Sequence, residues 1–259
     1  MMRLCTIVSG SSGNCAYVGL GGEHLLVDAG LSGKRAQQGL SQLDLPNPTA
    51  ILITHEHSDH IAGAGVLARR FGIPVYATPL TWRYFLRHKK LGPLNENQVK
   101  HITPGQPMMI GSAKVTAFDV PHDASQPVGY TFESEGNKLA MATDLGKATD
   151  TVLEYLREAK VILIESNHDV EMLQKGRYHD MLKERVLGPR GHLSNVAAGK
   201  LIVDVAWEGL KHVILGHLSE ENNRPMLAYD TVGRILDAHD VKARLSVADR
   251  YYTGEMIEI

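Results

Sequence analysis

Residues 54–60 have the sequence THEHSDH and directly follow an apolar stretch, 50–53, that is typical of a buried strand. Four of their side chains are candidate metal ligands, namely His55, His57, Asp59 and His60. Open α/β sheets place their chemistry at the carboxyl ends of strands, and neutral imidazole is the commonest metal ligand among side chains. The run therefore predicts a metal site at a strand end. The alternative is a solvated polar turn rich in histidine.

Composition narrows the class of protein. The chain has 259 residues, 43% hydrophobic and 22% charged, and no linker divides it, which favours a single domain covering 1–259 over two small ones. The net charge of −2 gives no overall positive field, so any contact with nucleic acid would need local patches. Cys5 and Cys15 are too few for a zinc cluster and are expected in buried strands. Without a signal peptide or the roughly 18 apolar residues of a membrane span, we expect a cytoplasmic protein with no membrane contact.

The order of apolar segments and turns predicts an α/β fold. Strands are expected at residues 4–8, 16–18, 24–28, 50–53, 74–77, 108–110, 114–119, 129–134, 138–142, 161–165, 212–215 and 244–248. Helices are expected at 33–43, from the histidine run to 71, and at 79–90, 150–158, 195–207 and 225–239. Strands followed by β/α alternation, twice over, predict an αββα sandwich of two mixed sheets with outer helices.

Further ligand-type residues stand where predicted strands end. His122, Asp144 and His217 each follow an apolar segment, and Asp28 ends another at 25–27. Each could simply cap a turn, which is the commoner role of a lone aspartate at a strand end. Because all of them repeat the placement of the histidine run, we predict that they converge on one site.

The order of these residues resembles the five motifs of the metallo-β-lactamase superfamily over essentially the whole chain. Shorter motifs resemble the YycJ/WalJ family in particular: SGSSGNC at 9–15, VDAGLS at 27–32, PHDA at 121–124, ESNHD at 165–169, GHLSN at 191–195 and GHLS at 216–219. The resemblance implies an αββα fold, a dinuclear metal site and hydrolase chemistry. Members of this family are associated with 5′-to-3′ exonuclease action on double-stranded DNA.

The resemblance also implies a role for each ligand-type residue. One ion would be held by His55, His57 and His122, the other by Asp59, His60 and His217, with Asp144 bridging them. Asp28 would accept a ring N–H from a histidine and fix its tautomer. A carboxylate bridge suits ions about 3.5–4 Å apart, as in two-metal phosphoesterases. This ligand set accepts Zn²⁺, Mn²⁺ or Fe²⁺, and the expected nucleophile is a hydroxide between the two ions.

Residues outside this ligand set are also predicted to act in catalysis, beside Asp59. His168 or His192 could protonate a leaving alkoxide or bind the phosphate, with Glu165 orienting one of them. The plainer alternative for His192 is a hydrogen-bonding residue at a helix start. Ser194 and Asn195 follow at that helix start, whose N–H groups suit a phosphate.

Two other stretches could contact an anionic substrate. In the basic and aromatic stretch 82–90, helical spacing predicts Arg83, Arg87 and Lys90 on one face, where they would contact phosphates unless the face is simply solvated. The SGSSGN loop at 9–14 could present N–H groups to an anion, although a tight turn explains its glycines equally well.

We therefore expect a two-metal phosphodiesterase with DNA as its partner. RNA and small phosphodiesters stay open as substrates, although the interval from Asp144 to His217 leaves no room for the inserted domain of RNA-processing relatives with this fold. The alternatives are a small-molecule phosphodiesterase, an ester or thioester hydrolase of the same fold, and a non-catalytic metal-binding interaction protein. The sequence does not indicate an oligomeric state.

Overall fold

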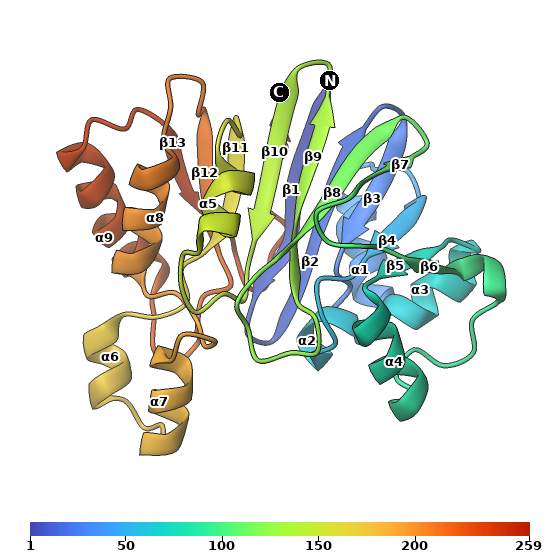
Figure 1. The fold of residues 1–259 in the computed structure, drawn as a ribbon, viewed down its shortest axis with the longest axis horizontal. Helices are drawn as coiled ribbons and strands as arrows, with labels where there is room; N and C mark the ends of the chain where they lie inside the picture. The colour runs from blue at the N-terminus through green and yellow to red at the C-terminus, as the bar shows by residue number, and fades with distance from the viewer.

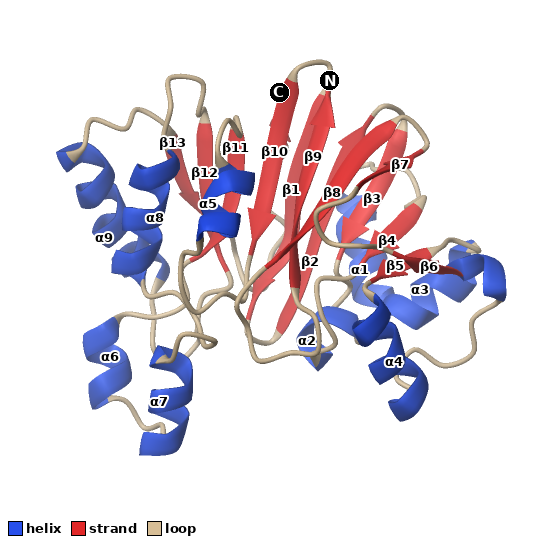
Figure 2. Cartoon of the chain, in the orientation of Figure 1, coloured by secondary structure: helices blue, strands red, loops and turns tan.

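Two seven-stranded β-sheets lie face to face in the computed structural model, which describes residues 1–259 (Figure 1, Figure 2). The first sheet has the strand order β14 (Ile257–Glu258), β1 (Met2–Gly10), β2 (Gly13–Leu20), β3 (Glu23–Val27), β4 (Ala50–Leu52), β5 (Val75–Ala77) and β6 (Val99–His101). The second has the order β13 (Arg244–Val247), β12 (His212–Gly216), β11 (Val161–Glu165), β10 (Asn137–Ala142), β9 (Val128–Ser134), β8 (Ala113–Asp119) and β7 (Pro107–Ile110).

Each sheet is antiparallel in one part and parallel in the other. β1, β2 and β3 form an antiparallel meander, and its second turn uses Gly21 and Gly22 with φ angles of +59° and +84°. From β3 to β6, and from β10 to β13, neighbouring strands are parallel. These parallel strands run toward the lower edge of the sandwich in Figure 1. The residues that follow them therefore gather along one edge.

Helices cover the outer face of each sheet. The first sheet carries α1 (Gly33–Gln42), α3 (Ala64–Phe71) and α4 (Pro79–His88), and a 3₁₀ turn, Glu96–Gln98, precedes β6. The second carries α5 (Asp150–Leu156), α8 (Asn195–Val205) and α9 (Pro225–Ala238). The short helix α2 (Ser58–Ile61) lies at the lower edge, and α6 (Val170–Lys175) and α7 (Asp180–Leu187) extend below the second sheet.

Three apolar layers hold this arrangement together. The central layer packs side chains of both sheets against each other and includes Leu25, Tyr130 and Phe132, all fully buried. A second layer joins the second sheet to α5, α8 and α9, and a third joins the first sheet to α1, α3 and α4. The predicted αββα sandwich is confirmed. Burial of both faces of each sheet explains why its strands read as nearly continuous apolar runs.

The element boundaries differ from the sequence prediction at a few places with clear physical causes. The helix expected to run from the histidine run to 71 is broken into α2 and α3 at Gly63, where a Cβ would lie 2.1 Å from the Leu31 carbonyl oxygen. The strands β6 and β14 and the helices α6 and α7 were not predicted, because they are short and largely exposed. Cys5 and Cys15 are free and buried in β1 and β2, as expected. None of the helices has the length and apolar character needed to cross a bilayer.

A substitution at Gly30 tests how tightly the chain packs against the histidine run at the lower edge of the sandwich. A Cβ at Gly30 would lie 1.5 Å from the Asp59 carbonyl oxygen, so Gly30→Ala should displace the histidine run and lower the free energy of unfolding by about 2–3 kcal/mol. Urea unfolding followed by circular dichroism measures this loss. The control is Gly233→Ala in α9, where the nearest atom would be 3.8 Å away and alanine should leave stability unchanged or raise it by about 1 kcal/mol. Equal stabilities of the two variants would contradict this account of the packing.

Candidate metal centre

The histidine run is anchored between the two sheets. It leaves β4 at Ile53 and Thr54, whose carbonyl oxygens accept hydrogen bonds from the second sheet. The Tyr130 hydroxyl donates to the Ile53 oxygen at 2.6 Å, and the Val128 N–H donates to the Thr54 oxygen at 3.0 Å. The backbone at the start of the histidine run is therefore bonded to both sheets.

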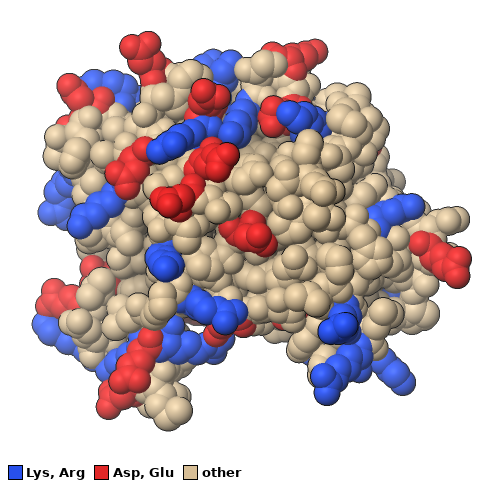
Figure 3. Space-filling view, in the orientation of Figure 1, with Lys and Arg blue, Asp and Glu red and all other residues tan.

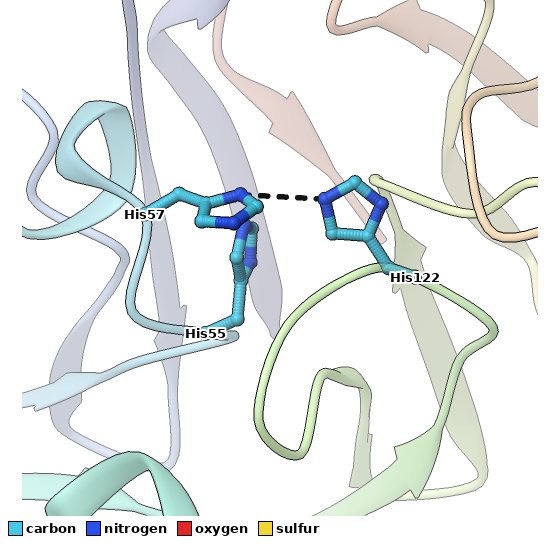
Figure 4. A group of neighbouring side chains, drawn as sticks. All are labelled: His55, His57 and His122. Carbon is cyan, nitrogen blue, oxygen red and sulfur yellow. Dashed lines mark hydrogen bonds between the residues drawn. The ribbon is translucent and has the colours of Figure 1, made fainter. Parts of the chain in front are cut away.

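The first group of converging side chains is His55, His57 and His122. Their ligand atoms lie within 4.8 Å of one another, and Figure 4 shows the three rings gathered around a common space. Nε2 of His122 lies 3.4 Å from Nδ1 of His57. His122 comes from the loop after β8, and the Arg190 guanidinium donates to its carbonyl oxygen at 2.7 and 3.0 Å.

A second group consists of Asp59, His60 and His217, whose ligand atoms also lie within 4.8 Å of one another. Asp144, from the end of β10, lies between the two groups. Its carboxylate is 3.3 Å from Nε2 of His60, 3.5 Å from Nε2 of His217 and 3.8 Å from Nε2 of His122. The structure thus brings together all seven residues that the sequence singled out as ligands.

Three residues that follow strands have left-handed backbone conformations. Asp28, Asp144 and His217 have φ angles of +59°, +58° and +54°. Such conformations cost about 1–3 kcal/mol at a non-glycine residue and cluster at functional sites. Here each of them turns the chain sharply at a strand end, which the apolar pattern of the sequence did not reveal.

Two buried carboxylates, those of Asp28 and Glu165, orient imidazole rings of the cluster through contacts with Nδ1. Oδ2 of Asp28 lies 2.7 Å from Nδ1 of His60 and accepts from the Thr54 hydroxyl at 2.9 Å, and Oδ1 accepts from the Thr54 N–H at 2.8 Å. Oε1 of Glu165 lies 2.7 Å from Nδ1 of both His192 and His217. The Leu145 and Leu193 N–H groups donate to Oε2 of Glu165 at 3.0 and 3.1 Å. These contacts leave Nε2 of His60 and Nε2 of His217 facing Asp144 in the cluster.

The electrostatics of the cluster favour a bound cation. Burial alone would lower the pKa of His217, yet Asp144, Asp59 and Glu165 raise it to about 10. Burial and the neighbouring imidazoles keep the pKa of His55 well below its usual range, so this ring is neutral and can act as a ligand. Nε2 of His55 and Nε2 of His217 are buried without a hydrogen-bond partner. An all-nitrogen and oxygen donor set of this kind fits divalent metal ions.

The predicted catalytic histidines differ in access. The His192 side chain is 19% exposed, and its Nδ1 is engaged by Glu165, so Nε2 is the nitrogen available at the site. His168 is 1% exposed, neither of its ring nitrogens has a partner, and burial lowers its pKa to about 4. That burial argues against direct contact between His168 and a substrate.

Two predicted substrate residues have structural roles at the start of α8. Asn195 is 1% exposed, and its amide is bonded to Ser166 and Asn223, so the prediction that it contacts substrate is wrong in this structure. The Ser194 hydroxyl caps α8 by accepting from the Ala197 N–H at 3.2 Å. Both residues build the helix start, as expected for Ser and Asn in these positions.

The predicted basic face is only partly present. Arg83 and Arg87 are exposed on α4. The prediction that Lys90 shares their helix face is wrong, because α4 ends at His88 and Lys89 has a left-handed φ of +50°. The left-handed residue turns the chain, so Lys90 lies beyond the helix.

Sequence reasoning missed two residues that hold the cluster. The Glu56 carboxylate accepts from the Ser125 N–H at 2.7 Å and from its hydroxyl at 2.6 Å, so it ties the histidine run to the loop that carries His122. Nδ2 of Asn14 lies 3.1 Å from Nε2 of His60 and donates to the Gly10 carbonyl oxygen at 3.1 Å. The only signal for Asn14 was the SGSSGN loop, whose glycines suggested a turn as readily as a site.

Comparison with known proteins identifies the family to which the chain belongs. The model of the β-lactamase superfamily domain matches residues 23–218. The exodeoxyribonuclease YycJ of Bacillus anthracis is 41% identical over 238 residues, which cover 91% of this chain and 89% of that protein. The exodeoxyribonuclease WalJ of Streptococcus pneumoniae (serotype 2, strain D39 / NCTC 7466) is 40% identical over 228 residues, 87% of this chain and 85% of that protein.

The fold is shared with solved structures of much lower identity. The metallo-β-lactamase fold protein YhfI of Bacillus subtilis superposes with a TM-score of 0.71 at 18% identity and covers 98% of both chains. The resemblance found in the sequence motifs is therefore confirmed. The chain belongs to the β-lactamase superfamily and, within it, to the YycJ/WalJ family of metal-dependent hydrolases.

Proposed function

We propose that this hydrolase is a dinuclear-metal phosphodiesterase that degrades double-stranded DNA from the 5′ end. The observation that carries the proposal is the sharing of Asp144 between two ligand groups, each with three further nitrogen or oxygen donors. Two adjacent ions joined by a carboxylate form the arrangement that phosphodiester hydrolases use to clamp a phosphate.

In this proposal His55, His57 and His122 hold one ion, Asp59, His60 and His217 hold the other, and Asp144 bridges them. Divalent ions bound there would supply an activated water near neutral pH and would stabilise charge on the phosphate. Asp28 and Glu165 orient His60 and His217, because each carboxylate holds the Nδ1 side of its ring at 2.7 Å.

His192 is the residue we assign to proton transfer. Its Nδ1 is held by Glu165 at 2.7 Å, its side chain is partly exposed, and Asp144 lies 3.9 Å from the same nitrogen. The P–O bond to the departing strand would break as Nε2 of His192 passes a proton to the leaving oxygen. Help of this kind is typically worth about 10²–10⁴-fold in rate.

The proposed substrate rests on the relatives and on surface charge. YycJ and WalJ, which this chain matches over most of their length, are named exodeoxyribonucleases. Arg83, Arg87, Lys89 and Lys90 are exposed on and just after α4, and no acidic residue lies between 79 and 95. Figure 3 shows Lys and Arg side chains at the lower right, where Figure 1 has α4, and the outline is hollowed between them and the mixed charges around α6 and α7. A duplex end could lie across that hollow with its phosphates near the cations.

Replacing a ligand should remove both metal and activity. For Asp59→Ala and His60→Ala we expect less than two metal ions per chain by elemental analysis and hydrolysis reduced at least about 100-fold. Circular dichroism should show a retained fold, and chelation of the wild-type protein should abolish activity. His239→Ala, at an exposed histidine after α9, is the matched control. Activity that survives both ligand substitutions would overturn the two-metal proposal.

Cleavage of labelled DNA tests substrate and polarity. With Mn²⁺ or Zn²⁺ added, a 5′-labelled duplex should release labelled nucleotide from the start of the reaction, while a 3′-labelled strand should shorten gradually. Single strands and RNA of the same sequence serve as comparison substrates. Turnover of small phosphodiesters, esters or thioesters without DNA cleavage would instead support the small-molecule hydrolase.

The basic helix should set the salt dependence of DNA binding. Arg83→Ala and Arg87→Ala should each weaken binding at every DNA sequence and reduce the slope of log affinity against log salt by about 1. Fluorescence anisotropy of labelled DNA measures this slope at salt concentrations from about 50 to 200 mM, where the affinity of phosphate-binding proteins falls steeply. Lys242→Ala, an exposed cation between α9 and β13, is the control and should leave the slope unchanged. Unchanged slopes for both arginine variants would remove α4 from the DNA interface.

A further inference from the structure

A small pocket of about 150 Å³ opens directly beside the metal centre. Its walls come from the β1–β2 turn, the residues after β11, helix α7 and the segment before α8. The residues that line it include Ser11, Asn167, Tyr178, Leu182, Arg185 and His192.

The pocket is continuous with the proposed reacting centre. His192 lines it, and Asp123, also in the wall, directly follows His122. Nδ2 of Asn167 donates to the His217 carbonyl oxygen at 2.9 Å, so this wall is bonded to the backbone of the cluster. A group held in the pocket would therefore belong to the nucleotide at the cleavage point or its neighbour.

The charges of the pocket favour a neutral occupant. Arg185 is the only lysine or arginine in the wall, and its Nε donates to the Asp123 carboxylate at 2.5 Å. His192 is in turn paired with Glu165. A terminal phosphate, which carries up to two negative charges, would find no uncompensated Lys or Arg there and would face the Asp123 carboxylate.

The shape and lining favour a flat, partly apolar group. Tyr178 supplies an aromatic wall, and Leu182 and Val186 of α7 supply apolar surface. Ser11, Asn167 and Ser219 add hydroxyl and amide groups that can donate or accept. The pocket volume lies below the roughly 300–1,000 Å³ of pockets that bind drug-sized ligands. The pocket therefore suits a single nucleobase and is too small for a larger part of the strand.

We propose that this pocket binds the unpaired base of the nucleotide at the end of the DNA strand. The inference rests on the proposed nuclease function and deepens it. A base can enter only after it leaves its pair, which is easiest at a strand end, so the pocket would favour terminal over internal cleavage. Stacking on an aromatic ring is tolerant of sequence, because every base has a π-face.

A substrate with a missing base tests the pocket with the wild-type, metal-loaded protein. Duplexes are compared that end, at the degraded terminus, in an ordinary nucleotide or in an abasic one, each with a terminal phosphate or hydroxyl. The abasic terminus should raise KM about tenfold, in the range expected for loss of one stacked base. The change from phosphate to hydroxyl should alter KM less than twofold.

Substitution of Tyr178 locates the effect. Tyr178→Ala should raise KM for the ordinary terminus about tenfold and should cause no further rise for the abasic terminus, because the base and the ring form one interaction. Tyr178→Phe keeps the ring and should behave like wild type. Tyr229→Ala, at an exposed tyrosine on α9, is the matched control.

Equal KM values for ordinary and abasic termini would overturn the inference. A tenfold dependence on the terminal phosphate would also overturn it and would indicate an anion site. Either result leaves the nuclease proposal intact, because DNA is still cleaved. If no DNA is cleaved in any arm, the proposed function itself fails. Should Tyr178→Ala fail to fold, the comparison of termini with the wild-type protein still decides the question.

Discussion

Contacts between buried carboxylates and imidazole rings are the interactions on which the rest of the site depends. Asp28 and Glu165 are 3% and 0% exposed, and carboxylates so deeply buried are tolerated only when hydrogen bonds satisfy them. Asp28 is held by Thr54 and His60, and Glu165 by two backbone N–H groups and two histidines. Burial alone would raise the pKa of Glu165, but His192 and His217 hold its pKa well below the usual range. The rings of His60 and His217 are thereby fixed with Nε2 toward the cluster.

The two-sheet architecture supplies the rigidity that this arrangement needs. The cluster draws residues from both sheets, and the contacts of Tyr130 and Val128 with the start of the histidine run join the sheets at the point where they must meet. Left-handed conformations at Asp28, Asp144 and His217 are energetically costly, and packing of the surrounding layers offsets that cost. The proposed reaction takes place at the lower edge of the sandwich. The basic helix α4 lies on one side of this edge, and the small pocket against α7 lies on the other.

Much of the site could be read from the sequence because its members follow apolar strands. His122, Asp144 and His217 were found by that placement, and the structure brings them to the histidine run. The predictions for Asn195 and Lys90 are wrong for local reasons. The helix start that favours phosphate binding does not reveal that the Asn195 side chain is buried, and the left-handed Lys89 that ends α4 has no reliable sequence signal. Glu56 and Asn14 escaped because their partners, Ser125 and His60, are 69 and 46 residues away in the chain.

The sequence by itself determined the chemistry of the donor set, the alternation of strands and helices and, through its motifs, the family. These properties are encoded locally, in residue type and in short-range apolar periodicity. Only the tertiary structure decided which histidine meets which carboxylate, that His192 is partly exposed while His168 is buried, and that a pocket lies between α7 and the cluster. Those outcomes depend on how two sheets and their loops pack together, and contacts between residues far apart in the chain leave no periodic trace in a single sequence.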